Sequence, residues 1–297
     1  MNKFACLVIC TFLPLSVSAS LKIATYNIKM YDSAPSSTNK AELKRIISDL
    51  GADFLTVQEI VNARSFVKFI KKEFSNYSVH LSKCGGGGRQ KIGFVYRSDK
   101  FKLTKAYEDK RISSPGNIVG KFGCGRLRPA LIGIFSEIKT KRKFVAIGVH
   151  LKAGGTSKSY IKRQKQYRIL SRIVDELKLA DYKNVLLMGD FNTTGFNLMD
   201  QDYTNFQNML KTTETLSSSA NLECTSYWSG RNRRDNVEES SVLDHVLYSA
   251  KFLKYKKIKS EVHSHCRRAK CEYVSPRTLG KSYNEVSDHC PVSVTFN

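Results

Sequence analysis

A carboxylate and an imidazole stand side by side near the end of the chain, at Asp288 and His289. Pro291 follows, and residues 292–296 then alternate between apolar and small polar side chains, which is typical of a half-buried strand. Such a strand would hold the pair at a sheet edge, where an imidazole can act as a general base. The dipeptide alone is more often a solvated turn, so a catalytic interpretation needs support from the rest of the chain.

Other polar side chains end or directly follow predicted apolar strands. Open α/β architectures place their sites at the carboxyl ends of strands, so these side chains are candidates for one shared site. Each has a structural alternative when taken alone, such as a turn cap for Asn27 or an exposed charge for Glu59. Their recurrence at the same position relative to the strands favours a site. The set comprises Asn27 after residues 21–26, Glu59 after 53–57, His150 after 144–149, Asp190 and Asn192 after 184–188, and Asp244 within 242–248.

Apolar residues at helical spacing predict three helices beside these strands. The first ends at Gly51, and the last carries basic residues opposite its apolar stripe. A basic face is usually only solvated, but its position after His150 makes phosphate binding an alternative. The predicted helices span residues 40–50, 61–74 and 159–179, and further strands span 77–81, 92–96, 101–107 and 130–138, with 92–96 and 101–107 forming a hairpin.

Four consecutive glycines, residues 85–88, precede Arg89 and Lys91. Neither the Walker spacing nor a following helix is present, so the segment does not match a phosphate-binding motif. We expect a mobile loop, with backbone contact to a ligand as the lesser alternative.

Seven short motifs, taken together, resemble the endonuclease/exonuclease/phosphatase superfamily of pancreatic-deoxyribonuclease-like enzymes. They occur in the order of that family over nearly the whole chain. The resemblance implies a four-layered α/β sandwich of two packed mixed β-sheets flanked by helices, which cleaves phosphoester bonds with a divalent cation. The motifs are Ala-Thr-Tyr-Asn-Ile at 24–28, Val-Gln-Glu at 57–59, Arg-Pro-Ala-Leu at 128–131, Val-His-Leu-Lys at 149–152, Gly-Asp-Phe-Asn at 189–192, Leu-Asp-His-Val at 243–246 and Ser-Asp-His-Cys-Pro at 287–291.

The resemblance also implies a metal site. Glu59 would be the principal ligand, with Asn27 and water completing the shell and Asp288 contributing. Carboxylate and amide oxygens are the hard donors that Mg²⁺ prefers, so Mg²⁺ or Mn²⁺ is expected, with Ca²⁺ as an alternative. The cation would offset the negative charge of the phosphate, which otherwise repels a nucleophile.

The same resemblance assigns catalytic roles. His289 would take the proton from the attacking water, and Asp244 would orient His289. His150 would stabilise or protonate the opposite side of the phosphate. Asp190 and Asn192 would hold the nucleophile and the phosphate in line.

Two arginines are candidates for binding the phosphate. Arg128 lies in the motif, but pancreatic-type enzymes place the arginine one residue earlier relative to the proline, where this chain has Leu127. Arg126 therefore remains a second candidate. His245, next to Asp244, is expected to have a packing role only.

The charge balance indicates a polyanionic partner. The chain has 49 Lys and Arg against 26 Asp and Glu, a formal charge of +23. Nucleic acid is the commonest such partner, and membrane surface and anionic cell-wall polymers are alternatives. Basic clusters lie at residues 139–143, 158–172, 231–234 and 254–259.

Residues 1–19 have the pattern of a signal peptide: Lys3, an apolar run and the small residues Val17-Ser18-Ala19. We expect export to the periplasm or the medium after cleavage near Ala19. The mature chain, residues 20–297, is predicted to be one domain, monomeric and without a transmembrane segment.

Six cysteines remain after the predicted cleavage, an even number that favours disulfides in an exported chain. Cys266 and Cys271 could close a short loop, and a Cys84–Cys124 bridge would leave Cys224 for Cys290. Fifteen connectivities are formally possible.

The leading functional hypothesis is an exported, divalent-metal-dependent nuclease that hydrolyses DNA, with RNA as a further substrate, and has little sequence preference. The alternative is a phospholipid or phosphoinositide phosphoesterase or a toxin-type subunit on the same fold. A bilayer-active enzyme should expose an apolar hairpin, and no convincing one is found in the sequence. A non-catalytic polyanion-binding protein is the third possibility, which the complete set of catalytic positions disfavours.

Overall fold

The computed structural model describes residues 20–297 apart from 35–36, 118–119, 121–122, 197, 231–233, 251, 253–254 and 256. The predicted signal peptide therefore lies outside the described residues. Parts of the basic clusters at 231–234 and 254–259 also lie outside them. Among the described helices, none is long and apolar enough to cross a membrane.

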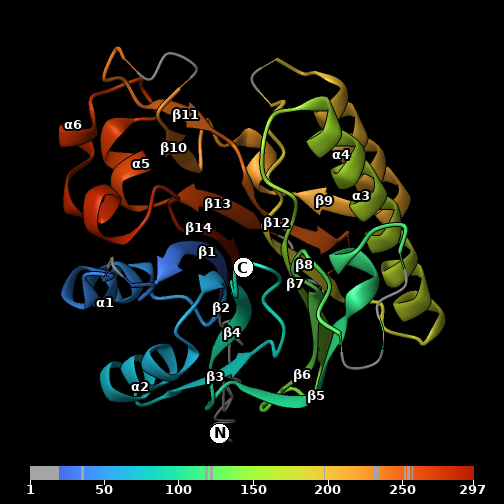
Figure 1. The fold of residues 1–297 in the computed structure, drawn as a ribbon. Helices are drawn as coiled ribbons and strands as arrows, with labels where there is room; N and C mark the ends of the chain where they lie inside the picture. The colour runs from blue at the N-terminus through green and yellow to red at the C-terminus, as the bar shows by residue number, and fades with distance from the viewer. Residues whose placement is uncertain are drawn as a thin grey trace, which may run out of the picture.

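Two six-stranded mixed sheets pack against each other (Figure 1). The first sheet has the order β13-β14-β1-β2-β4-β3 and the second β5-β6-β7-β8-β12-β9. The first contains β1 (Leu21–Tyr31), β2 (Phe54–Ile60), β3 (Tyr77–Leu81), β4 (Lys91–Arg97), β13 (Ile258–Val262) and β14 (Val292–Phe296). The second contains β5 (Phe101–Asp109), β6 (Ala130–Glu137), β7 (Lys143–His150), β8 (Val185–Asp190), β9 (Thr215–Ser217) and β12 (Asp244–Ser249).

Helices cover the outer faces of both sheets (Figure 1). α1 (Lys40–Leu50) and α2 (Ala63–Glu73) lie on the first sheet, and α3 (Ser157–Leu179) and α4 (Gln201–Thr213) lie on the second. The short α5 (Ser264–Ala269) and α6 (Pro276–Lys281) lie near a two-stranded ribbon of β10 (Ser226–Trp228) and β11 (Glu239–Ser241). One-turn segments cover Lys110–Ser113, Ser219–Asn221 and Ser282–Val286.

Three apolar cores hold these layers together. The core between the sheets is rich in aromatic rings, with Phe54 and Phe135 at 4.8 Å between ring centroids. A second core lies between the second sheet and α3 and α4, and a third between the first sheet and α1 and α2. Three cores between four layers confirm the predicted four-layered α/β sandwich.

Local signals set the predicted helix ends. Asn39 caps α1, where its side chain accepts a hydrogen bond from the backbone N–H of Glu42 at 3.0 Å. Gly51 ends the helix with a φ of 54°, a left-handed conformation that glycine adopts at little cost. The sequence prediction of a helix over residues 40–50 is therefore confirmed.

The predicted hairpin of residues 92–96 and 101–107 is wrong. β4 lies between β2 and β3 in the first sheet, whereas β5 pairs with β6 in the second. Both edges of β4 are therefore occupied by other strands, and residues 98–100 carry the chain from one sheet to the other. Two adjacent apolar strands with a short connection look like a hairpin in sequence, but the packing of two sheets offers β4 other partners.

The glycine segment at 85–88 forms a turn against the loop that contains Arg126. The N–H of Gly87 donates to the carbonyl of Arg126 at 3.0 Å. A Cβ at Gly86 would lie 2.8 Å from that carbonyl oxygen, so glycine permits the close approach. The Cys84–Cys124 disulfide joins the same two loops, which confirms this predicted bridge.

The other predicted disulfides are wrong, because the bridges are Cys224–Cys271 and Cys266–Cys290. Cys266 lies inside α5, and its backbone N–H is 3.1 Å from the sulfur of Cys290. After α5 ends, Lys270 and Cys271 adopt left-handed conformations with φ of 52° and 58°. This turn directs Cys271 away from Cys266 and toward Cys224.

Candidate active site at the strand ends

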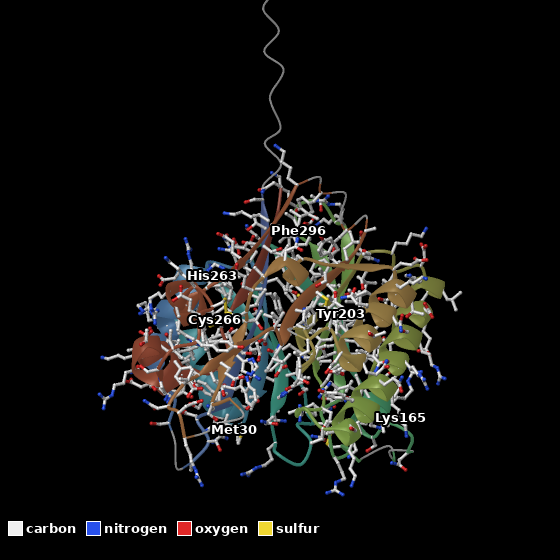
Figure 2. The ribbon with its side chains drawn as sticks, turned by 90° about the horizontal axis from the view of Figure 1, so that it is seen from above. Met30, Lys165, Tyr203, His263, Cys266 and Phe296 are labelled. Carbon is white, nitrogen blue, oxygen red and sulfur yellow. A yellow bond between two sulfur atoms is a disulfide. The ribbon has the colours of Figure 1, made fainter. Side chains whose placement is uncertain are left out.

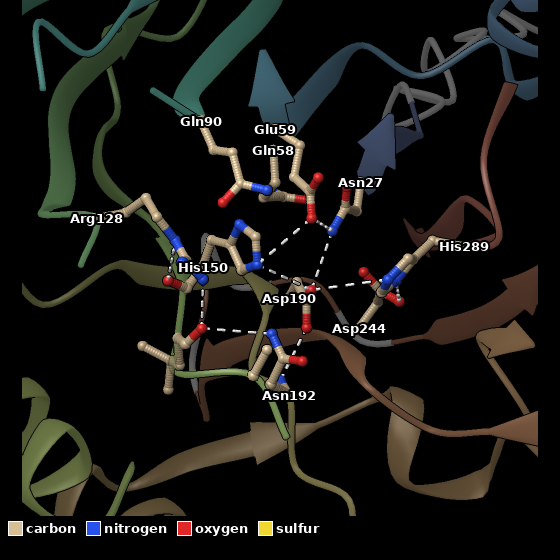
Figure 3. Close-up of polar contacts among 12 residues, drawn as sticks. Asn27, Gln58, Glu59, Gln90, Arg128, His150, Asp190, Asn192, Asp244 and His289 are labelled. Atoms are coloured by element: carbon tan, nitrogen blue, oxygen red, sulfur yellow. Dashed lines mark hydrogen bonds and ion pairs between the residues drawn. The ribbon is translucent and has the colours of Figure 1, made fainter. Parts of the chain in front are cut away.

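Seven of the predicted site residues converge at one edge of the sandwich (Figure 3). The parallel pairs β1/β2 and β7/β8 bring their carboxyl ends to the same edge, where His150 is in register with Asp190. The antiparallel strand β12 starts there, with Asp244 opposite Asp190. The residues brought together are Asn27, Glu59, His150, Asp190, Asn192, Asp244 and His289.

An irregularity in the β1/β2 pairing directs Glu59 into the site. The register shifts after Asn27, and Glu59 has a φ of 62°. The amide nitrogen of Asn27 donates to Glu59 Oε1 at 3.1 Å and to Asp190 Oδ2 at 3.0 Å. The backbone N–H of Met30 donates to the other Glu59 oxygen at 3.0 Å. Asn27 thus connects the carboxylates of the two sheets.

Asp190 lies at the centre of the cluster. Its Oδ2 is 3.4 Å from His150 Nε2 and 3.8 Å from His289 Nε2. Its Oδ1 accepts the backbone N–H of Asn192 at 2.8 Å. The preceding Gly189 has a φ of 144°, and a Cβ there would lie 2.0 Å from the carbonyl oxygen of Val149. Glycine is therefore required for β8 to lie this close to β7.

His289 and Asp244 form a hydrogen-bonded pair, with Nδ1 and Oδ2 2.7 Å apart. The hydroxyl of Thr225 donates to the same Asp244 oxygen at 3.1 Å. Ser287 accepts the backbone N–H of His289 at 3.1 Å and donates to the carbonyl of Asn27 at 2.7 Å. Asp244 thus holds the imidazole at Nδ1 and Ser287 holds the backbone of His289, while Nε2 lies toward Asp190.

Burial and charge shift the pKa values of these groups in different directions. Burial raises the pKa of Asp190 to about 6, although His289 opposes the shift. Burial alone would lower the pKa of His289, but Asp244 and Asp190 offset it and raise that pKa well above 6.5. Burial, with Arg128 and His289, lowers the pKa of His150 well below 6.5. The structure therefore favours a protonated His289 beside a neutral His150.

Three predicted ligands lie outside this cluster or are already bonded. Asp288 forms an ion pair with Lys29 at 2.9 Å. Arg128 donates to the backbone carbonyls of His150 and Leu151 at 3.1 and 2.5 Å, so much of its guanidinium is committed to the end of β7. Arg126 is exposed on the loop beside Gly87. Phosphate binding by the arginines and metal binding by Asp288 stay predictions.

Several supporting residues were not predicted. Thr225 and Ser287 position Asp244 and His289, and Ser287 belongs to the recognised Ser-Asp-His motif, which was a usable signal. Thr225 lies in a loop without a motif.

Arg163 is fully buried and pairs with Asp202 at 2.8 Å. Arg163 lies three residues after Tyr160 and four before Tyr167, within the apolar stripe of α3. Its burial could therefore have been predicted from this helical spacing.

His245 has the packing role that was predicted for it. Its ring lies among Phe191, Phe196 and Phe206 at centroid distances of 4.5–5.5 Å. Ser219 contacts Nδ1 at 2.9 Å, and burial lowers the pKa of the ring to about 3. It therefore stays neutral and does not join the active-site cluster.

The donor atoms of the cluster fit a hard divalent cation. Glu59 and Asp190 present carboxylate oxygens to one space, and the side chain of Glu59 is 14% exposed. One ligand atom each from Asp190, Asp244 and His289 also lies within 4.8 Å of the others. Because Asp244 and His289 are already bonded to each other, we favour Glu59 as the ligand. Asn27 Oδ1 accepts the N–H of Lys29 at 3.0 Å, so metal binding through it would have to replace that bond.

Two packed mixed sheets with carboxylates and histidines at one edge agree with the arrangement that the resemblance in sequence implied. The family model described as Endonuclease/Exonuclease/phosphatase family matches residues 24–289. The chain belongs to this family, whose enzymes are phosphoesterases that generally depend on a divalent metal. Comparison with proteins of curated function found no significant match.

Several solved structures have the same fold, and each of the following three is covered over nearly its whole length. TDP2 from D. rerio, complexed with a single-strand DNA product, has a TM-score of 0.63 at 17% identity, covering 94% of this chain and 99% of that one. The Bacteroides thetaiotaomicron mannosyl-6-phosphatase has a TM-score of 0.61 at 20% identity, covering 92% and 98%. A Bacteroides thetaiotaomicron protein of the family has a TM-score of 0.61 at 19% identity, covering 94% and 98%. At these identities the likeness shows the fold alone.

Proposed function

We propose that this protein is an exported nuclease that hydrolyses phosphodiester bonds of DNA, and of RNA as a second substrate, with a divalent metal. The observation that carries the proposal is the convergence of Glu59, Asp190 and two histidines from both sheets on one site. The formal charge of +23 supports a polyanionic substrate over a small phosphomonoester. Three disulfides among the described residues support an oxidising compartment, in accordance with the predicted signal peptide.

In this proposal His289 is the proton acceptor. Asp244 holds Nδ1 of the ring, and Nε2 faces Asp190, so Nε2 is the atom that can take a proton from water. The imidazole can accept this proton only in its neutral form. Because Asp244 and Asp190 raise the pKa of His289 well above 6.5, the fraction of the neutral form increases as the pH rises. Asp190 and Asn192 orient the water and the phosphate.

His150 and the metal act on the phosphate itself. Because the pKa of His150 is lowered, its ring is neutral at pH 7 and serves as a hydrogen-bond donor rather than as an acid. Glu59 would hold Mg²⁺ or Mn²⁺, with Asp190 and Asn27 as neighbours. A bound cation would neutralise charge on the nonbridging phosphate oxygens.

The test is hydrolysis of plasmid DNA, RNA, sphingomyelin and phosphoinositides by residues 20–297, with Mg²⁺, Mn²⁺ or Ca²⁺ and with EDTA. We expect nucleic-acid cleavage that EDTA abolishes and that Glu59→Gln lowers by at least about a hundredfold. Glu272→Gln is the matched control, because this exposed residue lies outside the site. Full activity in EDTA would exclude the metal mechanism.

One observation favours the lipid phosphoesterase as a second candidate. Leu198 and Met199, in the loop between β8 and α4, are 72% and 71% exposed, and Ile161 near the start of α3 is 55% exposed. Exposed apolar side chains near basic residues are typical of proteins that bind a membrane surface. Turnover of sphingomyelin or phosphoinositides without nuclease activity would establish this candidate in place of the nuclease.

A further inference from the structure

The solvent face of α3 carries five basic residues. Their spacing of three or four residues places them on one side of the helix. From the first to the last, 14 residues at 1.5 Å per residue span about 21 Å. Figure 2 shows one of them, Lys165, at the outer side of the molecule. The five exposed residues are Lys158, Lys162, Lys165, Arg168 and Arg172.

These five cations are not neutralised by ion pairs within the described part of the chain. The ion pairs of α3 are made instead by Arg163, Glu176 and Lys178. Asp175, exposed three residues beyond Arg172, ends the run of one sign, and Glu176 is bonded to Arg111 at 2.6 Å. A helix that is only solvated usually intersperses both signs of charge on its outer face, and this face has one sign over four turns.

A groove of about 330 Å³ runs beside this face, between α3 and α4. Arginine, amide and hydroxyl groups line it, and no lining residue is acidic. These are the side chains that bind phosphate oxygens in nucleic-acid complexes. The groove is lined by Gln164, Arg168 and Arg172 from α3 and by Asn205, Asn208 and Thr212 from α4, among other residues.

Asn205 supplies a second, independent observation. Its residue is only 8% exposed, and its side-chain oxygen accepts hydrogen bonds from Gln164 at 3.1 Å and Gln201 at 3.3 Å. Its amide nitrogen has no protein partner in the described structure. Because this nitrogen is not one of the buried polar atoms without a partner, solvent reaches it, and the wall of the groove offers a free amide donor to water or a ligand.

The basic face begins close to the catalytic edge. His150 ends β7, and α3 starts at Ser157, a few residues later. Arg163 joins the helix to that connection, because its guanidinium donates to the carbonyls of Lys152 and Gly154. A polyanionic strand that extends from the site along α3 would therefore contact Lys158 first and the groove last.

We propose that the α3–α4 groove, with the basic face of α3, is a second binding surface for the phosphate backbone of a nucleic-acid strand. The ligand class rests on the proposed function, but binding at the groove requires no cleavage. The lining combines Tyr167 and Met209 with two arginines, amides and hydroxyls and contains no acid, which favours a phosphodiester backbone over a membrane, because a membrane-binding face combines basic residues with a broad apolar surface.

The experiment measures binding of a fluorescein-labelled 30-nucleotide single strand by anisotropy, in EDTA so that no cleavage occurs. Arg168→Gln/Arg172→Gln is compared with Lys68→Gln/Lys71→Gln, which removes the same charge from exposed positions of α2. We expect the groove variant to bind about tenfold more weakly, and the salt slope of log K to fall by about 1.4, or 0.7 for each lost phosphate contact. The α2 variant should change affinity by less than about twofold.

Asn205→Asp tests the groove without removing a cation. This change keeps the oxygen that accepts from Gln164 and replaces the unused donor with a negative charge, so binding should weaken by about fivefold while the thermal midpoint stays within a few degrees. Equal binding by all variants, or equal losses for the α2 and groove pairs, would overturn the proposal. Loss of binding to phosphatidylserine vesicles, with strand binding unchanged, would overturn it in favour of a membrane.

A separate measurement distinguishes this proposal from the nuclease proposal. The groove variant should hydrolyse bis(p-nitrophenyl) phosphate at the wild-type rate, because that substrate is too small to reach the groove. If wild type cleaves no nucleic acid but the groove variant still loses strand binding, the groove stands and the nuclease proposal fails. If cleavage occurs and strand binding is unchanged in the groove variant, the nuclease stands and the groove fails.

Discussion

At the scale of the residue, Asp244 illustrates how the site is positioned. One of its oxygens is shared by His289 and Thr225, and the other is buried without a hydrogen-bond partner among the described residues. A buried carboxylate in this condition is stabilised mainly by the imidazolium next to it. The charge state of His289 therefore matters for both folding and catalysis.

The pH profile of wild type tests the assigned role of His289. Because Asp244 and Asp190 raise the pKa of His289 well above 6.5, the fraction of neutral base grows with increasing pH. Initial rates of DNA cleavage at constant ionic strength should therefore rise as the pH increases above neutrality. His289→Gln should lose about 10²- to 10⁴-fold in rate and the alkaline rise with it. A wild-type rate that falls above pH 7 would contradict the role of base.

Thr225 gives a second prediction at this scale. Thr225→Val removes the hydroxyl that holds Asp244 but keeps the size of the side chain, so we expect about a tenfold loss in kcat with little change in KM. The same hydroxyl accepts the backbone N–H groups of Leu243 and Asp244, so the free energy of unfolding should fall by about 1–3 kcal/mol. Thr225→Ser should restore most of the rate, which a purely packing role of the methyl group would not allow.

At the scale of the element, α3 is tied to the site by a buried ion pair. Arg163 and Asp202 are both fully buried, and Asp202 also accepts the N–H of Thr194 at 3.0 Å. The guanidinium reaches the connection after β7, so this one pair joins α3, α4 and two loops next to the site. Its value lies in fixing these elements relative to one another, because desolvation offsets much of the attraction.

Breaking this pair should be costly, whereas replacing it should not. Arg163→Met leaves a buried carboxylate without its partner, and the free energy of unfolding should fall by about 3–5 kcal/mol in urea titrations. The double variant Arg163→Met/Asp202→Leu should recover most of that loss. The exposed pair Lys183–Asp181 is the control, and Lys183→Ala should change the free energy of unfolding by less than about 1 kcal/mol. A small effect of Arg163→Met would show that water reaches the pair.

At the scale of the whole molecule, two disulfides attach the segment of His289 to the rest of the fold. Cys290 directly follows His289, and Cys224 directly precedes Thr225. Backbone hydrogen bonds also join residues 225–227 to residues 288–290. In one of them the N–H of Cys290 donates to the carbonyl of Thr225 at 2.8 Å. The bridges to α5 and to Cys271 therefore hold both sides of the His289–Asp244 pair.

Reduction should lower both stability and activity. The bridges Cys224–Cys271 and Cys266–Cys290 span 47 and 24 residues, so each should contribute about 3–4 kcal/mol in the chain-entropy account. Cys266→Ala/Cys290→Ala should therefore unfold at lower urea and cleave DNA more slowly at 25 °C. An unchanged urea midpoint in dithiothreitol, after all thiols are shown to be free, would contradict this.

Much of the fold and of the site was predictable from sequence because the signals are local. The ends of α1 follow from Asn39 and Gly51. His150 and Asp190 end β7 and β8, whereas Asn27 and Glu59 lie inside β1 and β2, and each of these four polar residues follows an apolar run. Once strands are parallel, their ends must meet at one edge, so the convergence of Glu59, His150 and Asp190 was expected. The motifs also placed His289 beside Asp244.

The tertiary structure alone decided which distant segments became partners. Whether β4 pairs with β5, whether Cys271 meets Cys266, and whether Asp288 turns to the site or to Lys29 all depend on distances between segments remote in the chain. The periodicity of apolar side chains and the helix caps carry no information about such distances. The distances depend on how the two sheets and the helices that cover them pack together around the apolar cores. The sequence by itself determined the chemistry available at the strand ends, and packing decided which of those groups face one another.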